Sequence, residues 1–166
     1  INDGVLVPAD QLLDRAIQSP YNQSVLPLVN FWKGEIAFRN GKTDEAIRFY
    51  NEYLSNPVTN SEVNQQNARY NLGYSYLRKE LYKQAQVSFE QVVKAPGLKS
   101  SAVEQDAYIR AADCYYMQRD YKKAGAMYDQ VIQYGWASGD YASFQKAMIA
   151  GIGSSSEKVK LLQQMQ

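Results

Sequence analysis

The stretch NLGYSYLRKELYKQAQVSFEQVVKAP, residues 71–96, decides the fold because its small and aromatic residues recur along the chain. Within it, Leu72 and Gly73 are followed by Tyr76, Ala85, Phe89 and Pro96. The same order of residue types recurs 39 positions earlier and 39 positions later, since Gly34, Gly73, Ala112 and Gly151 are evenly spaced. The companion residues in the flanking units are Ala46, Tyr50 and Pro57 on one side, and Tyr115, Ala124, Tyr128 and Gly135 on the other.

A fixed period with fixed internal offsets is typical of stacked repeats, in which each unit buries its apolar face against its neighbours. Each period contains two stretches with apolar residues at helical spacing, and in the central unit these are 64–79 and 82–95. The sequence therefore predicts an all-α fold of about eight helices, paired antiparallel and stacked as a right-handed superhelix.

The predicted organisation is a single array over residues 1–166. It comprises a truncated leading half-repeat (1–20), three repeats (22–57, 61–96 and 100–135) and a partial terminal repeat (139–166). Three capping-box patterns, which begin at Thr59, Ser101 and Ser154, predict helix starts. Because both ends are apolar, we expect the chain to be part of a longer repeat protein, or to pack through its last helix (157–166) on another molecule.

Composition excludes several classes of function. Eighteen basic and seventeen acidic residues leave a formal net charge of +1, which argues against a general electrostatic grip on nucleic acid. The chain has no histidine and one cysteine, Cys114, so a His- or Cys-rich metal site is not expected. Nothing supplies a base near neutral pH, and we expect no enzyme activity, no cofactor and no membrane insertion.

The motif Leu72-Gly73-x-x-Tyr76, Ala85-x-x-x-Phe89 and Pro96 resembles the tetratricopeptide repeat, a helix-turn-helix unit. The flanking units keep the pattern in register, and the resemblance covers about residues 22 to 166. This chain departs from the family in its longer period, 39 residues instead of 34, and in Lys33, which stands where an aliphatic residue is usual. The longer units are similar to repeats of bacterial cell-envelope proteins of the Tol-Pal-associated and outer-membrane-assembly types, which implies a periplasmic location more than a cytoplasmic one.

The resemblance also implies a function. In this family the first helices of the repeats line a concave groove that holds a partner's peptide or helix. Carried over to this chain, the groove-facing set is Phe31, Glu35, Phe38, Arg39, Asn67, Tyr70, Tyr74, Arg78, Asp106, Ile109, Asp113, Tyr116 and Met117. Its aromatic and mixed-charge composition is typical of binding hot spots, and the charged members are expected to set register and specificity.

The leading hypothesis is therefore a non-catalytic scaffold or adaptor that binds another protein. One alternative is an architectural spacer or dimerisation segment within a larger repeat protein. A second is binding of a glycan or small molecule on the tyrosines of the groove, since tyrosine rings serve as stacking platforms.

Overall fold

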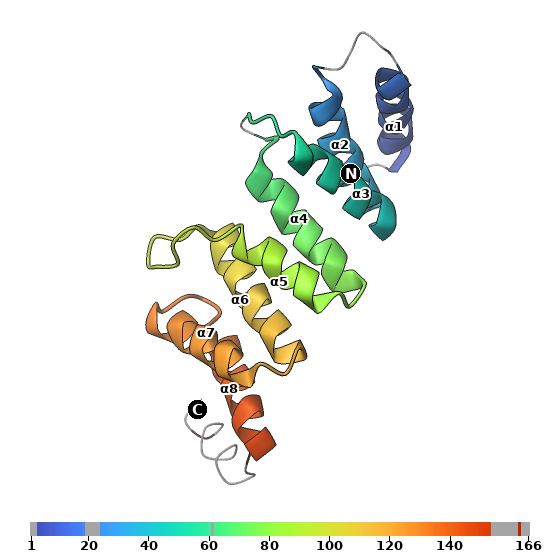
Figure 1. The fold of residues 1–166 in the computed structure, drawn as a ribbon. Helices are drawn as coiled ribbons and strands as arrows, with labels where there is room; N and C mark the ends of the chain where they lie inside the picture. Colours follow the sequence, from blue (N-terminus) through green and yellow to red (C-terminus); the bar gives the residue numbers. More distant parts are fainter. Residues whose placement is uncertain (1–2, 19–23, 61, 154–162, 164–166) are drawn as a thin grey trace. The chain divides into compact units, whose positions relative to one another are not determined.

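The computed structural model describes residues 3–18, 24–60, 62–153 and 163. All regular elements in these residues are helices (Figure 1). They are α1 (Asp3–Gln18), α2 (Leu26–Arg39), α3 (Thr43–Ser55), α4 (Gln65–Arg78), α5 (Tyr82–Glu90), α6 (Ala102–Met117), α7 (Tyr121–Gln133) and α8 (Gly139–Gly153). The predicted all-α class is confirmed for this part of the chain, and the predicted helix over 157–166 lies outside the described residues.

The chain forms two compact units, residues 1–81 with α1 to α4 and residues 82–166 with α5 to α8. The division falls between the two helices of the predicted repeat 61–96. A single array over 1–166 stays a prediction.

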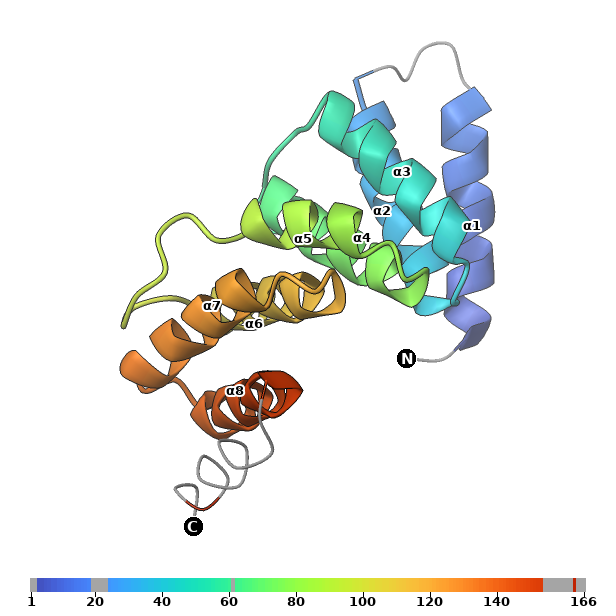
Figure 2. The same ribbon diagram turned by 60° about the horizontal axis from the view of Figure 1, so that its bottom comes forward.

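In the first unit, α2 and α3 form a tight hairpin, and α1 and α4 pack beside it (Figures 1 and 2). Its core is aromatic. The ring of Phe31 on α2 meets the rings of Tyr50 and Tyr53 on α3 edge-on, with centroids 6.2 and 5.3 Å apart. Leu72 on α4 belongs to the same buried cluster.

Gly34 lets α2 and α3 approach closely. A Cβ atom built at Gly34 would lie 2.9 Å from two ring carbons of Tyr50, so any side chain there would push the ring away. The sequence predicts close packing of this glycine in the hairpin, and the structure confirms it.

In the second unit, α6 and α7 form the equivalent hairpin, with α5 and α8 packed on either side (Figure 2). Ala112, Ala124 and Tyr128 are completely buried in its core. Trp136, between α7 and α8, joins this core and donates its indole N–H to the carbonyl of Gly97 at 3.2 Å.

The turns that follow α2, α4 and α6 repeat as well. Gly41, Glu80 and Arg119, 39 positions apart, all have positive φ, at 72°, 58° and 63°. The amide that follows each of them donates to the carbonyl five residues back, as in Asp120 N to Tyr115 O at 2.9 Å and Leu81 N to Tyr76 O at 3.0 Å. These bonds are those of the Schellman motif, which satisfies the last carbonyls of a helix.

One expected helix end and one expected capping box are wrong, whereas the expected start of the first central stretch at residue 64 is confirmed. The second stretch of the central unit was expected to run to Ala95, but α5 ends at Glu90, where the chain tightens through a bond from Val92 N to Phe89 O at 3.0 Å. α4 is capped by Asn64 rather than Thr59, because the side chain of Asn60 accepts from the amides of Glu62 and Val63 and forms a turn first. The capping box of Ser101 with Glu104 is confirmed, and the one at Ser154 lies outside the described residues.

The left-handed turn predicts a stabilising substitution. Arg119→Gly should raise the free energy of unfolding by up to about 1 kcal/mol, because a side chain is strained at positive φ and glycine is not. Urea unfolding followed by circular dichroism measures the change. The matched control, Lys122→Gly in the first turn of α7, should lower stability by about 1 kcal/mol, and equal losses in the two variants would contradict the prediction.

Candidate functional site: the first-helix faces

The carboxylate of Glu35 on α2 is an internal hydrogen-bond centre of the first unit. Its Oε1 accepts from the hydroxyl of Tyr50 on α3 at 2.7 Å and from the side-chain amide of Asn71 on α4. Its Oε2 faces Nη2 of Arg39 at 3.4 Å. The Glu35 side chain is only 12% exposed, so this predicted groove residue joins three helices and is largely committed to the fold.

Asp113 on α6 plays the same part in the second unit. Its Oδ1 accepts from the hydroxyls of Tyr128 on α7 at 2.6 Å and Tyr141 on α8 at 2.9 Å. Its Oδ2 pairs with Nη1 of Arg110 at 2.7 Å, and Nε of the same guanidinium lies 3.4 Å from Asp106. Both predicted groove aspartates therefore have partners within their own unit.

The two centres are related by the repeat. Glu35 and Asp113 lie two periods apart, as do Tyr50 and Tyr128. In the intervening unit, Phe89 stands at the position of Tyr50 and Tyr128, and Tyr74 stands at the position of Glu35 and Asp113. In these three units, a carboxylate is therefore present only where a buried tyrosine hydroxyl needs an acceptor. This covariation within one sequence is the signal that could have revealed the bond.

Burial and the adjacent carboxylates raise the pKa of both core tyrosines, Tyr50 and Tyr128. The same causes raise the pKa of Tyr141 to about 12. All three hydroxyls therefore remain protonated donors at neutral pH, and the bonds to Glu35 and Asp113 are retained.

Two predicted groove residues are core residues instead. Phe31 is 2% exposed and Ile109 is 3% exposed, and each belongs to the buried cluster of its unit. The prediction that they contact a partner is wrong, because adjacent helices cover the helix faces on which they lie.

An aromatic and arginine cluster remains accessible in the first unit. The guanidinium of Arg78 stacks 4.2 Å from the ring centroid of Phe38 and donates to the Phe38 carbonyl at 3.0 Å. Arg39 is 46% exposed. Nearby on α4, the rings of Tyr70 and Tyr74 meet edge-on with centroids 5.1 Å apart and are half-buried.

Three further predicted groove residues, Asn67, Tyr116 and Met117, have different surroundings. Asn67 lies in the first turn of α4, where its side chain donates to the Glu62 carbonyl at 2.9 Å. In the second unit, Tyr116 packs edge-on against Tyr121 at 5.5 Å, and Met117 is half-exposed at the end of α6.

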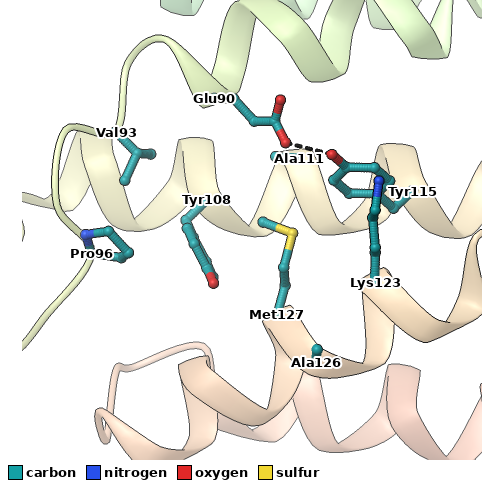
Figure 3. A pocket seen from close by; sticks show the side chains of 9 residues that line it. All are labelled: Glu90, Val93, Pro96, Tyr108, Ala111, Tyr115, Lys123, Ala126 and Met127. Atoms are coloured by element: carbon teal, nitrogen blue, oxygen red, sulfur yellow. Dashed lines mark hydrogen bonds between the residues drawn. The ribbon is translucent and has the colours of Figure 1, made fainter.

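Each unit has a hollow on its surface. The first, of about 360 Å³, lies between α1 and α2 and includes Glu35 and Arg39 in its lining. The second, also about 360 Å³, lies between the end of α5, α6 and α7 (Figure 3). Tyr108, Tyr115 and Met127 surround it, and it contains none of the predicted groove residues.

The second hollow lies where this repeat has smaller side chains than the preceding one. Ala111 and Ala126 line it, whereas the preceding repeat has Leu72 and Val87 at these positions. Both charged residues of its lining have partners, since Glu90 accepts from the Tyr115 hydroxyl at 2.6 Å (Figure 3) and Lys123 lies 3.6 Å from Asp120.

The described residues contain no cluster of three or more metal-ligating side chains. Cys114 is fully buried, and burial, with the nearby charge of Asp113, raises the pKa of its thiol to about 12. A protonated, inaccessible thiol is a poor nucleophile. Among the described helices, none combines the length and apolar character needed to cross a membrane.

The buried bond of Glu35 predicts a coupled stability loss. Glu35→Ala should lower the free energy of unfolding by about 1–3 kcal/mol, because the Tyr50 hydroxyl loses its acceptor in the interior. In a Tyr50→Phe background the same substitution should cost clearly less. Urea unfolding of the four proteins in this cycle measures the coupling, and strictly additive losses would show that the bond contributes nothing.

The comparisons with known proteins agree with this architecture. The model of the tetratricopeptide repeat family matches residues 9–60 and 70–142. No curated protein matches the sequence. Solved structures that share the fold do so at low identity, and two of them serve as examples. The crystal structure of MamA is 16% identical with a TM-score of 0.70 over 98% of this chain and 87% of that one. The tetratricopeptide-like repeats of a putative kinesin light chain from Podosopora anserina are 18% identical with a TM-score of 0.69, over 98% and 86%. Since the family model covers well over half of the residues, this chain belongs to the tetratricopeptide repeat family.

Proposed function

We propose that this chain is a non-catalytic scaffold whose first-helix faces bind a peptide or helix of another protein. Tetratricopeptide arrays generally act through protein–protein interaction, and stacked repeats present extended binding surfaces. The observation that carries the proposal is the partly exposed cluster of Phe38 and Arg39 on α2 with Tyr70, Tyr74 and Arg78 on α4.

The chemistry of this cluster suits a protein ligand. Arginine and tyrosine are enriched among residues that dominate binding energy. The hydrogen bonds of Glu35 to Tyr50 and Asn71 join α2, which carries part of the cluster, to α3 and α4. Because these helices are held together, little conformational entropy is lost when a partner binds. Its acidic residue is largely used internally, which leaves aromatic and cationic groups as the main contacts.

The extended period of 39 residues supports a further proposal, that the chain works in a bacterial cell envelope, where repeats of similar length occur. This rests on sequence resemblance alone. Expression of the tagged protein followed by fractionation of cytoplasm, periplasm and membranes tests the location.

A peptide selection tests the binding proposal. Peptides selected from a displayed random library on the native protein should lose at least about tenfold in affinity on Arg78→Ala and on Tyr74→Ala, because both remove hot-spot side chains. Calorimetry measures affinity, and circular dichroism checks folding.

The control is Glu52→Ala, an exposed position on α3, which should leave affinity unchanged. Selected peptides that bind all three variants as tightly as the native protein would place the site elsewhere and overturn the proposal.

One observation favours self-association as a second function. On α8, Phe144, Met148 and Ile152 follow one another at four-residue spacing, which places them on one helix face. Phe144 is 45% exposed and Ile152 is 54% exposed. Large apolar side chains clustered on a surface often mark an interface.

Light scattering tests this second proposal. The native protein should show a mass that rises with concentration, and Phe144→Lys with Ile152→Lys should return it to the monomer, because two charges would have to be desolvated in the contact. Gln133→Lys, an exposed position on α7, is the matched control. A native protein that stays monomeric at all concentrations would rule the interface out.

A further inference from the structure

Helix α1 lies beside the hairpin of α2 and α3 (Figure 2) but buries little apolar surface. None of its side chains at residues 9–18 is buried, whereas each of α2 to α8 has buried residues. Leu12 is 63% exposed and Ile17 is 39% exposed. The hollow between α1 and α2 also keeps Leu12 and Leu13 apart from Trp32. Apolar burial therefore contributes little to holding α1 in place.

Two ion pairs attach α1 to α2 instead. The Lys33 side chain on α2 is 7% exposed, and its Nζ lies 2.8 Å from Oδ1 of Asp10 and 2.5 Å from Oδ1 of Asp14. Burial lowers the pKa of Lys33, but the hydrogen bonds and charges of the two aspartates outweigh it, so the pKa is raised. The lysine is therefore charged at neutral pH, and the attachment of α1 is ionic where the repeat pattern has an aliphatic residue.

An attachment of this kind costs little to open. The attraction between two charges inside a protein is largely offset by the cost of removing them from water. Asp10 and Asp14 are 34% and 54% exposed, so water and salt weaken their attraction to the lysine further. When α1 leaves, both aspartates enter water and Nζ of Lys33 is uncovered beside the Phe49 ring, whose centroid is 5.2 Å away. No charge is left buried without a partner.

The sequence of α1 does not stabilise it as an isolated helix. Pro8 stands inside α1, where it has no N–H to donate and costs about 3 kcal/mol. Asp10 and Asp14 are like charges four residues apart, which destabilise a helix when no cation lies between them. A helix of 16 residues is also marginal in water without tertiary contacts. Helix α1 therefore depends on its attachment to α2.

The rest of the first unit is held together by other contacts. Glu35 and Arg39 also line the hollow, but Glu35 Oε2 lies 3.4 Å from Nη2 of Arg39 on the same helix. Glu35 Oε1 accepts from Tyr50 of α3 and Asn71 of α4. This network joins α2, α3 and α4 without α1, so it is retained when α1 leaves.

We propose that α1 is a releasable cover on α2, which opens as a unit while the hairpin of α2 and α3 stays folded. Release uncovers Lys33 together with Trp32 and Ile36, which line the hollow opposite α1. Ionic strength controls access to this face of α2, because salt screens the ion pairs that close it. The inference goes beyond the proposed peptide binding and does not rest on it.

Amide hydrogen exchange of the full chain, followed by NMR, tests the release. Amides of residues 11–18 should exchange at least about a hundredfold faster than those in the middle of α3, because local opening needs less free energy than unfolding of the hairpin. Raising sodium chloride from about 50 mM to about 500 mM should increase this ratio at least about threefold. Equal protection in α1 and α3, or a ratio that does not respond to salt, would overturn the inference.

Substitutions assign the attachment to its residues. Asp10→Asn with Asp14→Asn should accelerate exchange in α1 at least about tenfold, because Lys33 then has no carboxylate partner while α1 is closed. Adding Lys33→Met to this variant should slow exchange again, since the unpaired charge is gone. The matched control is Asp129→Asn, which removes a similarly exposed carboxylate that pairs with Lys146. It should leave exchange in α1 unchanged.

The amides of α3 report whether release is local. They should exchange at the native rate in the aspartate variants, because the Glu35 network does not involve α1. Acceleration of α3 by the same factor as α1 would show that the two unfold together and would overturn the inference. Exchange in α1 that stays at the native rate when both aspartates are replaced would also overturn it, since the ion pairs would then not hold the cover.

Discussion

The structure depends on the contact between an aromatic ring on the second helix of a hairpin and a small residue on the first. A methyl group at Gly34 would lie 2.9 Å from the Tyr50 ring, so the helices approach each other as closely as this ring allows. A glycine within a helix costs about 0.5–1 kcal/mol relative to alanine, which the close packing offsets. In the second unit, Ala112 and Tyr128 are likewise completely buried.

This contact has a polar consequence. When the ring is a tyrosine, its hydroxyl emerges on the first-helix face and needs an acceptor, which Glu35 and Asp113 provide at 2.7 and 2.6 Å. The carboxylates that one would assign to ligand recognition are therefore engaged in holding hairpins to the next helix. The charged side chains of the cluster around Phe38 are those of Arg39 and Arg78.

The sequence predicted both ends of α4 and the start of α5 to within one residue, because a strong apolar period is a local signal. The sequence-based prediction was wrong where a neighbouring side chain took the expected hydrogen-bonding role. Thr59 did not cap α4, since Asn60 formed a turn and Asn64 took the cap. It also placed Phe31 and Ile109 on the binding face, because family spacing gives the side of a helix but not how far its neighbours reach around it. How the remaining groove residues meet a partner stays a prediction.

The sequence by itself determined the repeat length, the pairing of helices into hairpins and the close packing at Gly34, since all of these follow from residue types at fixed short separations. Only the tertiary structure decided which charges face solvent. In the sequence, Lys33 only departs from the repeat pattern, whereas in the structure it pairs with Asp10 and Asp14 of α1. From the sequence, Glu35 is expected to be a surface charge, whereas in the structure it accepts hydrogen bonds from Tyr50 of α3 and Asn71 of α4. The physical reason is that desolvation and pairing depend on segments far apart in the chain, and no local pattern records which of them will meet.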